Sequence, residues 1–370
     1  LHKSSIDEHG FASHIRQVLH TLYDRDFDSF TQSCKPRLVI AGHDLKFISP
    51  VIDKLKTYFA IKIDEWSGHN QHNPIQSEEM LEWADYIWCE WLLGNAVWYS
   101  QRKKSHQKLI VRMHRFELGR EFGEQINIAN VDSVVAVSLL FFERLIERFP
   151  NIPRAKVRLI HNFVEVQGYE QSSSDERQFN IALIGIVPYR KGLYKGLEIL
   201  KQLKLHDSRY RLKVFGTEPK DIPWLQKHEL EMSYYKKCDE FIATNDLADS
   251  ISFLGHCNIK RALAQHDVGY VLSLSENTQG YPGPESFHLA IADGFAAGAL
   301  SLIMEWDGCE YIYPAVFIKE SPNSIVNTIV ETPPSSLQFV NQCELGKQLL
   351  VKKYSLEEFI LRFKDVFNGN

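Results

Sequence analysis

The sequence lacks most of the features that mark metal, disulfide and membrane proteins. Its six cysteines are scattered and form no Cys-x-x-Cys pair, which argues against a structural zinc site and a disulfide framework. No apolar run approaches the roughly 20 residues that a membrane-spanning helix needs. The net charge of −5 gives no general attraction to nucleic acid or to an anionic membrane. Any phosphate-binding surface must therefore come from a local cluster of cations.

The remaining composition is that of a globular protein of ordinary polarity. Hydrophobic residues make up 44% of the 370 residues and charged residues 24%, and the length suits two domains better than one core. Because scattered cysteines suit a reducing environment, we expect a cytoplasmic location. The printed chain opens with Leu1 and not with Met, so we expect a mature form or a piece of a larger protein.

Short β-rich apolar runs alternate with segments of helical periodicity along the chain. In the first half we expect strands at 37–42, 58–63, 85–91, 108–114, 133–138 and 156–162. In the second half we expect them at 179–185, 210–216, 250–255, 268–275, 298–304 and 315–318. Strands that alternate with helices predict an α/β protein with two parallel sheets, each covered by helices on both faces.

A polar segment at 166–178, "VQGYEQSSSDERQ", separates the two halves and predicts a linker. We therefore expect one domain over 1–165 and a second over 179–354. The amphipathic stretch "SLEEFILRFKDVF" predicts a C-terminal helix within 355–370. Ligands of open parallel sheets bind at the carboxyl ends of the strands, so a cleft between the domains is the expected site.

The stretch "PESFHLAIADGFAAG" at 284–298 carries two acids in an otherwise apolar segment. Read as one helix, it places Asp293 about 80° around the axis from Glu285 and about 12 Å along it, so both acids would face one elongated ligand. Free N–H groups around Ser286 to Leu289 would bind phosphate or sugar oxygens. The ordinary alternative is an acid at a helix start and another on a solvated face. However, Asp293 lies among apolar residues, and a buried carboxylate without a role is rare.

This stretch resembles the Glu-x7-Glu signature of retaining GT-B glycosyltransferases of the family 4 type (glycosyl transferases group 1). The family motif reads Glu-Gly-Phe-Gly-Leu, three residues, and Glu-Ala-x-Ala-x-Gly, and this chain has "ESFHL", "AIA" and "DGFAAG". The segments "RLIHNFV", "RLKVFGTEP" and "FLGHCNIKRALAQHDVGYVLSLSE" also resemble family motifs. The resemblance implies a GT-B fold, in which two Rossmann-like domains face each other across a cleft. The chain departs from the motif where Asp293 replaces a Glu and His288 replaces a Gly.

The resemblance also implies roles for individual residues. Glu285 would contact the transferred sugar, and Asp293 would bind the ribose of the nucleotide. Further donor contacts would come from Gly185, Gly216, Ser286, Phe287, His288 and Leu289.

Cations cluster in the stretch "LIGIVPYRKGLYKGLEIL" at 183–200. A strand is expected to end at Gly185, and Arg190, Lys191 and Lys195 follow near the start of a helix. Such cations neutralise a diphosphate and the charge that develops on a leaving nucleoside diphosphate. A solvated basic turn is the alternative. We expect Arg190 to act with one of the two lysines, and the spacing does not choose between them.

His114 is the last residue of the strand expected at 108–114. A histidine at the carboxyl end of a strand can hydrogen-bond a sugar hydroxyl or transfer a proton. The family has a histidine after the corresponding strand, near the reacting sugar. The resemblance therefore places the acceptor hydroxyl beside His114.

Together these features predict transfer of a sugar from a nucleoside-diphosphate sugar to an acceptor hydroxyl, with retention of configuration and without a metal or cofactor. The expected acceptor is a carbohydrate or glycolipid of bacterial surface polysaccharide or glycolipid synthesis, and no nucleic acid takes part. Through such an acceptor the protein would associate peripherally with the inner face of the membrane. Two alternatives stay open: a GT-B enzyme of another class, such as a nucleotide-sugar epimerase or a phosphorylase, and a catalytically silent scaffold that binds a nucleotide sugar.

Overall fold

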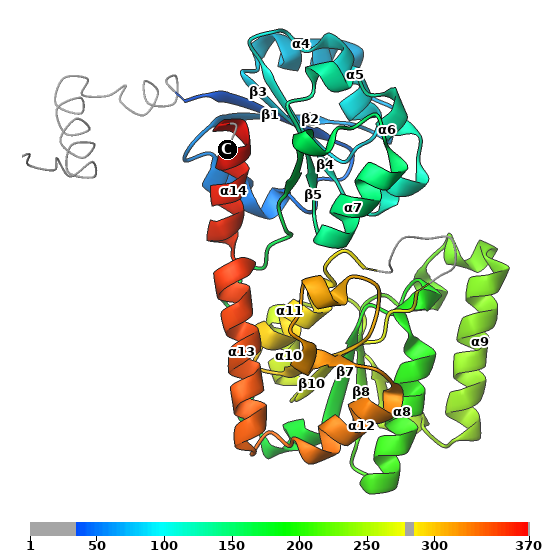
Figure 1. Ribbon diagram of the computed structural model, residues 1–370. Helices are drawn as coiled ribbons and strands as arrows, with labels where there is room; N and C mark the ends of the chain where they lie inside the picture. The colour runs from blue at the N-terminus through cyan, green and yellow to red at the C-terminus, as the bar shows by residue number, and fades with distance from the viewer. Residues whose placement is uncertain (1–34, 278–284, 369–370) are drawn as a thin grey trace, which may run out of the picture. The chain divides into compact units, whose positions relative to one another are not determined.

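The computed structural model describes residues 35–277 and 285–368, which form two parallel six-stranded sheets with flanking helices (Figure 1). The first sheet has the strand order β2-β1-β3-β4-β5-β6. Its strands are β1 (Arg37–Gly42), β2 (Ala60–Glu65), β3 (Tyr86–Glu90), β4 (Lys108–Met113), β5 (Ser133–Ala136) and β6 (Val157–Leu159). The helices of this part are α3 (Ile52–Leu55), α4 (Pro74–Trp83), α5 (Gly94–Arg102), α6 (Phe122–Gln125) and α7 (Leu139–Arg148).

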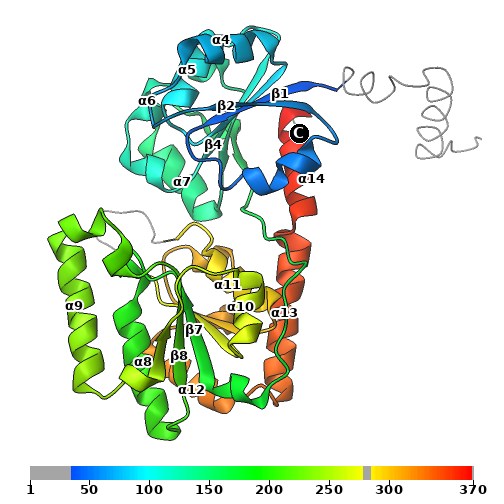
Figure 2. The ribbon, with the colours of Figure 1, turned by 180° about the vertical axis from the view of Figure 1, so that it is seen from behind.

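The second sheet has the order β12-β11-β10-β7-β8-β9. Its strands are β7 (Asn180–Ile184), β8 (Arg211–Phe215), β9 (Ile251–Phe253), β10 (Tyr270–Ser273), β11 (Leu300–Met304) and β12 (Ile318–Lys319). The helices that follow β6 in the chain are α8 (Leu193–His206), α9 (Glu229–Thr244), α10 (Ile259–Gln265), α11 (Leu289–Ala296), α12 (Pro322–Glu331), α13 (Leu337–Lys353) and α14 (Leu356–Asn368). Helices α8, α9 and α12 cover one face of this sheet, and α10, α11 and α13 lie on the other (Figures 1 and 2).

Each of the twelve strands expected from the sequence overlaps a strand of the structure. The last expected strand, 315–318, began too early, because Ala315–Phe317 form a 3-10 helix and Ile318–Lys319 are the residues that pair with β11. No helix within 35–277 and 285–368 is long and apolar enough to cross a membrane.

Close packing fixes α11 between the second sheet and α13. A Cβ on Gly294 would lie 2.3 Å from Ser301 Oγ of β11, so only glycine allows this approach of helix to sheet. On the other side, the ring of Phe295 fits against Gly346 of α13, where an added Cβ would lie 2.2 Å from the ring. Because interiors packed this tightly resist displacement, α11 is a rigid support for the loop that precedes it.

Candidate functional site

The second sheet contains a topological switch point between β7 and β10. From this pair, the strand numbers rise toward both edges of the sheet, in the order β9-β8-β7-β10-β11-β12. The chain therefore leaves β7 and β10 toward opposite faces, and the carboxyl ends of such a strand pair are where ligands of these sheets bind. The predicted donor residues follow these two strands in sequence.

Two glycines line this edge of the sheet. Gly185 follows β7 with φ +76°, and a Cβ added there would meet nothing within 4 Å. Gly216 follows β8 with φ +115°, and a Cβ added to it would lie 3.4 Å from the Cα of Gly185. The Gly185 N–H donates to the carbonyl of Phe215 at 2.7 Å, which holds the turn in place. The left-handed backbone and the missing side chains let a ligand approach the main chain here.

The described part of this stretch, 285–298, is not one helix. Helix α11 begins at Leu289, because His288 has φ +56° and ψ +80°, a left-handed conformation that cannot continue a right-handed helix. Glu285 therefore lies in the loop before the helix, and the predicted 80° relation between Glu285 and Asp293 is wrong. The free N–H groups of the helix were predicted around Ser286 to Leu289. They belong instead to the first turn of α11, which starts at Leu289. The predicted end of the helix is confirmed, with Gly298 at φ +73° just beyond it.

Glu285 is the centre of a buried ionic cluster. Its Oε1 accepts hydrogen bonds from Lys191 Nζ at 2.5 Å and from Ser275 Oγ at 2.7 Å, and Arg190 NH1 lies 3.7 Å away. Burial by itself would raise the pKa of Glu285, but the nearby His288, the Lys191 ammonium and the Ser275 hydroxyl outweigh it and lower the pKa to about 2. Glu285 is therefore ionised over the whole physiological range.

Backbone geometry places Lys191 and Arg190 at this cluster. They form a 3-10 turn, Tyr189–Lys191, that ends on Gly192 at φ +80°. A Cβ on Gly192 would lie 2.1 Å from the Leu274 carbonyl oxygen, so this turn requires glycine and lies directly against the chain leaving β10. Of the two lysines that the sequence left open, Lys191 contacts Glu285, whereas Lys195 pairs with Glu276 at 3.3 Å.

His288 is buried beside Glu285. Its Nδ1 lies 2.6 Å from Ser273 Oγ, which also accepts a hydrogen bond from Trp306 Nε1 at 3.3 Å. Trp306 can only donate, whereas the Ser273 hydroxyl can either donate its own proton to Nδ1 or accept one from it. Burial, and then the Lys191 charge, lowers the pKa of His288 to about 3, so the ring is neutral at physiological pH. Within the described residues Nε2 is buried without a hydrogen-bond partner.

Of the residues next to His288, Phe287 is buried, whereas Ser286 and Leu289 are more accessible. Phe287 is buried, with its ring 5.0 Å from that of Tyr354, and its carbonyl accepts a hydrogen bond from Tyr313 Oη at 2.7 Å. Its side chain therefore holds the loop to the core and does not point to a ligand. Ser286 is half-buried, and Leu289 is 52% exposed at the start of α11.

Asp293 has a different environment from Glu285. It is buried in α11 and accepts a hydrogen bond from Tyr169 Oη at 2.5 Å. Burial raises the pKa of Asp293 to about 6, although the Tyr169 bond and the charge of Lys260 oppose this. Tyr169 comes from the segment 166–178, so this polar segment contributes a partner to one of the predicted site residues.

His114 follows β4 in the first sheet and is buried. Its backbone N–H donates to Glu117 Oε1 at 3.0 Å, which closes the turn after the strand. This confirms its expected place at the carboxyl end of a strand, and its role toward an acceptor stays a prediction.

Comparison with known proteins gives the fold. No protein-family model matches the chain, and no curated protein matches its sequence. Among solved structures, Anabaena Alr3699/HepE in complex with UDP and glucose matches with a TM-score of 0.64 and 12% identity, over 91% of this chain and all of that one. A UDP-forming α,α-trehalose-phosphate synthase from Burkholderia xenovorans matches with a TM-score of 0.67 and 10% identity, over 91% and 99%. Sucrose-phosphate synthase from Thermosynechococcus elongatus matches with 0.64 and 13%, over 90% and 98%. The fold is GT-B.

In this GT-B chain, the structure brings together Arg190, Lys191, Glu285 and His288 and places Lys195 and Asp293 in separate contacts. Sequence reasoning missed Ser273, Ser275 and Trp306, which orient the buried acid and imidazole. The two serines do lie at the end of the strand predicted at 268–275, in "SLSE", which is a usable signal. Tyr169 and Trp306 gave no such signal, because an aromatic residue in a polar segment or after a strand is equally compatible with packing. Within the described residues no group of three or more His, Cys, Asp or Glu side chains is placed to hold a metal ion.

Proposed function

We propose that this chain is a retaining glycosyltransferase that moves a sugar from a nucleoside-diphosphate sugar to an acceptor hydroxyl. One observation carries the proposal: Lys191 and Arg190 meet the buried Glu285 at the switch point of a doubly wound sheet. Cations beside an accessible main-chain edge suit a diphosphate, and a permanently ionised carboxylate suits sugar hydroxyls. The GT-B neighbours support the same chemistry, since two of them are described with UDP as ligand or product.

In the proposed reaction, the bond between the sugar C1 and the phosphate oxygen breaks, and the acceptor oxygen bonds to C1 from the same face. The proton of the acceptor hydroxyl passes to the leaving diphosphate, so no separate protein base is needed. Arg190 and Lys191 stabilise the negative charge that develops on the diphosphate. They supply the positive charge that the step requires, and the proposal therefore includes no metal or other cofactor.

The binding roles follow from the same placement. Glu285 holds hydroxyls of the transferred sugar, and the main chain at Gly185 and Gly216 lets the nucleotide approach the sheet. Asp293, with its partner Tyr169, binds the ribose. On the acceptor side we place His114 beside the attacking hydroxyl of a carbohydrate or glycolipid. The setting that we propose is polysaccharide or glycolipid synthesis at the cytoplasmic face of a bacterial membrane.

The first experiment is a thermal-shift screen of the chain against UDP, GDP, ADP, CDP and CMP and their common sugars. A ligand at 100 times its dissociation constant adds about 2.7 kcal/mol, which moves the melting temperature of such a domain by several degrees. We expect UDP or a UDP-sugar to stand out, with the shift reduced in Lys191→Gln. No shift with any nucleotide from a folded sample would overturn the proposal.

A transfer assay then separates the proposal from its rivals. With the best donor and a panel of glycan acceptors, NMR of the product should show the donor's anomeric configuration retained. Conversion of the nucleotide sugar without an acceptor would identify an epimerase, and dependence on inorganic phosphate would identify a phosphorylase. Donor binding without turnover over a broad acceptor panel would identify a scaffold.

A further inference from the structure

The loop that carries Arg190 and Lys191 runs from Ile186, just after β7, to Tyr194 in the first turn of α8. Helix α9 lies beside α8 on the same face of the sheet (Figures 1 and 2). Because loops are more mobile than the strands and helices that they join, the contacts that fix this loop also fix its two cations. Three side chains of α9 form hydrogen bonds with the main chain of the loop.

Glu231 of α9 binds the turn that contains the cations. Its Oε2 accepts a hydrogen bond from the Tyr189 N–H at 2.8 Å, and Tyr189 is the first residue of the 3-10 turn with Arg190 and Lys191. Glu231 is only 8% exposed. A buried carboxylate is rare and costly unless it has partners, so this bond to the main chain gives the acid a purpose. The reaction proposed above does not use it.

Two tyrosines of α9 bind the loop on either side of this turn. Tyr235 Oη donates to the Ile186 carbonyl at 2.8 Å, and Tyr234 Oη accepts from the Tyr194 N–H at 2.8 Å. Tyr194 is the second residue of α8, so its bond satisfies one of the N–H groups that a helix start leaves without a partner. The ring of Tyr234 also lies 5.6 Å from the ring of Tyr189.

The three side chains lie on one face of α9, because residues three and four positions apart in a helix are neighbours. They bind the main chain at the start, in the middle and at the end of the loop, and Arg190 and Lys191 lie between the last two of these points. Cations that stabilise a diphosphate act best when their positions are fixed before the ligand arrives. The contacts with α9 fix the backbone from which both cations extend.

We propose that Glu231, Tyr234 and Tyr235 are positioning residues, which hold Arg190 and Lys191 where they bind the diphosphate of the donor. The inference rests on the proposed function, since it takes these cations to be the diphosphate site. It adds that α9, a helix outside the donor motif, controls the affinity for the diphosphate. A purely structural role would change the stability of the protein and leave this affinity unchanged.

The test is calorimetric titration of the full chain with UDP and with inorganic pyrophosphate, and uridine is the control without a diphosphate. Glu231→Ala removes the acceptor, whereas Glu231→Gln keeps a carbonyl oxygen for the Tyr189 N–H. Tyr235→Phe is the second variant, which tests the inference even if Glu231→Ala does not fold. Hydrogen–deuterium exchange of 186–194 measures separately whether the loop has become less ordered.

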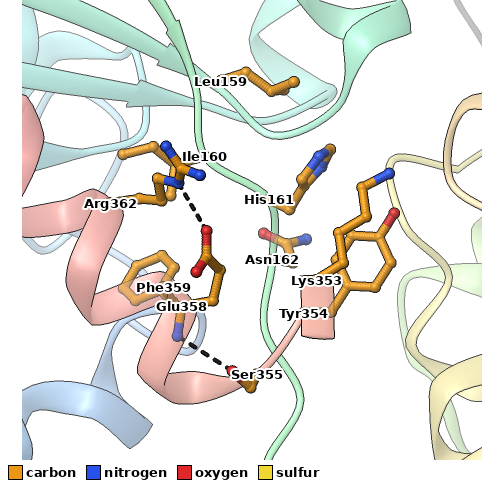
Figure 3. A pocket seen from close by; sticks show the side chains of 10 residues that line it. All are labelled: Leu159, Ile160, His161, Asn162, Lys353, Tyr354, Ser355, Glu358, Phe359 and Arg362. Atoms are coloured by element: carbon orange, nitrogen blue, oxygen red, sulfur yellow. Dashed lines mark hydrogen bonds and ion pairs between the residues drawn. The ribbon is translucent and has the colours of Figure 1, made fainter. Parts of the chain in front are cut away.

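Two matched controls remove similar groups elsewhere in the chain. Glu358→Ala removes a carboxylate of α14 that accepts a hydrogen bond from Arg362 Nε at 2.8 Å (Figure 3). Tyr270→Phe removes a buried hydroxyl that donates to the Thr332 carbonyl at 2.8 Å. Neither bond involves the loop 186–194, so these variants should leave the affinity for UDP unchanged.

We expect Glu231→Ala to weaken UDP and pyrophosphate binding at least about tenfold, with faster exchange in 186–194, because the turn loses a hydrogen bond to a charged group. Tyr235→Phe should act in the same direction, and Glu231→Gln should bind UDP like the wild type. Any binding of uridine should stay unchanged. In a Lys191→Gln background, Glu231→Ala should weaken UDP binding much less, because one of the cations that it positions is gone.

Three results would contradict this inference. If Glu231→Ala and Tyr235→Phe bind UDP as tightly as the wild type, α9 does not position the cations, and the proposed function stays intact. If Glu231→Gln loses as much affinity as Glu231→Ala, the charge of the acid matters and its bond to the Tyr189 N–H does not. If the wild type binds neither UDP nor pyrophosphate at millimolar concentration, the proposed function fails and this inference fails with it.

Discussion

Lys191 Nζ lies 2.5 Å from Glu285 Oε1, although the two residues are 94 positions apart in the chain. The contact joins the turn after β7 to the loop before α11, across the switch point of the second sheet. Both side chains are largely buried, with 18% and 11% of their surfaces exposed. Removal of one partner from such a pair leaves the other as an uncompensated buried charge. Substitution of either residue should therefore change both activity and stability.

The pair predicts a difference between two neighbouring lysines. If Lys191 stabilises the leaving diphosphate, Lys191→Gln should lower kcat by about 10²- to 10³-fold, as expected when one preorganised donor is lost. Lys195→Gln should change kcat by less than tenfold, because Lys195 is paired with Glu276 and not with Glu285. Steady-state kinetics with the donor found by thermal shift would measure both. Equal losses in the two variants would mean that both lysines serve the diphosphate.

Asp293 predicts a stability that falls as pH rises. Its pKa is 3.8 in an unperturbed chain and about 6 in the folded protein, so the folded state resists ionisation. The contribution of Asp293 to the free energy of unfolding therefore falls as pH rises from about 3.8 to about 6, by up to about 3 kcal/mol, and stays at that lower level above pH 6. Asp293→Asn should be more stable than the wild type at neutral pH and equal to it below pH 3.8. Urea denaturation at several pH values would measure this.

Two variants control the Asp293 experiment. Tyr169→Phe removes the hydroxyl that stabilises the charged carboxylate, so it should destabilise the protein more at neutral pH than at low pH. Asp207→Asn should act in the opposite direction to Asp293→Asn, because its exposed pair with Arg209 lowers the pKa of Asp207 to about 2. If Asp293→Asn shows no gain at neutral pH, the pKa of Asp293 is not raised in the folded state and another group compensates the buried charge.

The sheets could be predicted from sequence because their central strands are buried on both faces. Runs such as "RLVIAG" and "NIALI" have no solvent face, so apolar content alone marks them, and the helices between them have the helical period. The order of the strands does not follow from such local patterns. The switch point between β7 and β10, which locates the site, became visible only in the structure.

The start of α11 shows the limit of sequence reasoning more sharply. The apolar period of 285–298 continues without a break, and nothing in it marks His288 as left-handed. A glycine at that position would have given the signal, since glycine is the residue that usually takes a positive φ. Likewise, Lys191-Gly192 and Lys195-Gly196 were equivalent in sequence, and the different carboxylate partners of the two lysines distinguish them only in three dimensions.

His288 gives a prediction about the backbone alone. His288→Gly and His288→Ala delete the same imidazole, so the difference between them reports the left-handed conformation. His288→Gly should be more stable by about 1 kcal/mol, because alanine is strained at φ +56° and glycine is not. The exposed Asp246, at φ +53°, is the matched control, and its Gly and Ala variants should differ by a similar amount in urea denaturation. An alanine variant as stable as the glycine variant at 288 alone would show that the loop relaxes there.

Gly185 tests whether the glycine-lined edge takes the nucleotide. Gly185→Ala places a methyl group where nothing of the protein lies within 4 Å, at φ +76°. The strain should lower stability by about 1–2 kcal/mol. Gly168→Ala should lose a similar amount, since Gly168 has φ +84° and its nearest neighbour would be Lys260 Cδ at 3.9 Å. If the nucleotide lies against Gly185, only Gly185→Ala should also weaken nucleotide binding, at least about tenfold, because the methyl group occupies space that the ligand needs. Calorimetric titration of both variants with the nucleotide would test this. Unchanged affinity in Gly185→Ala would show that the nucleotide does not bind at the end of β7.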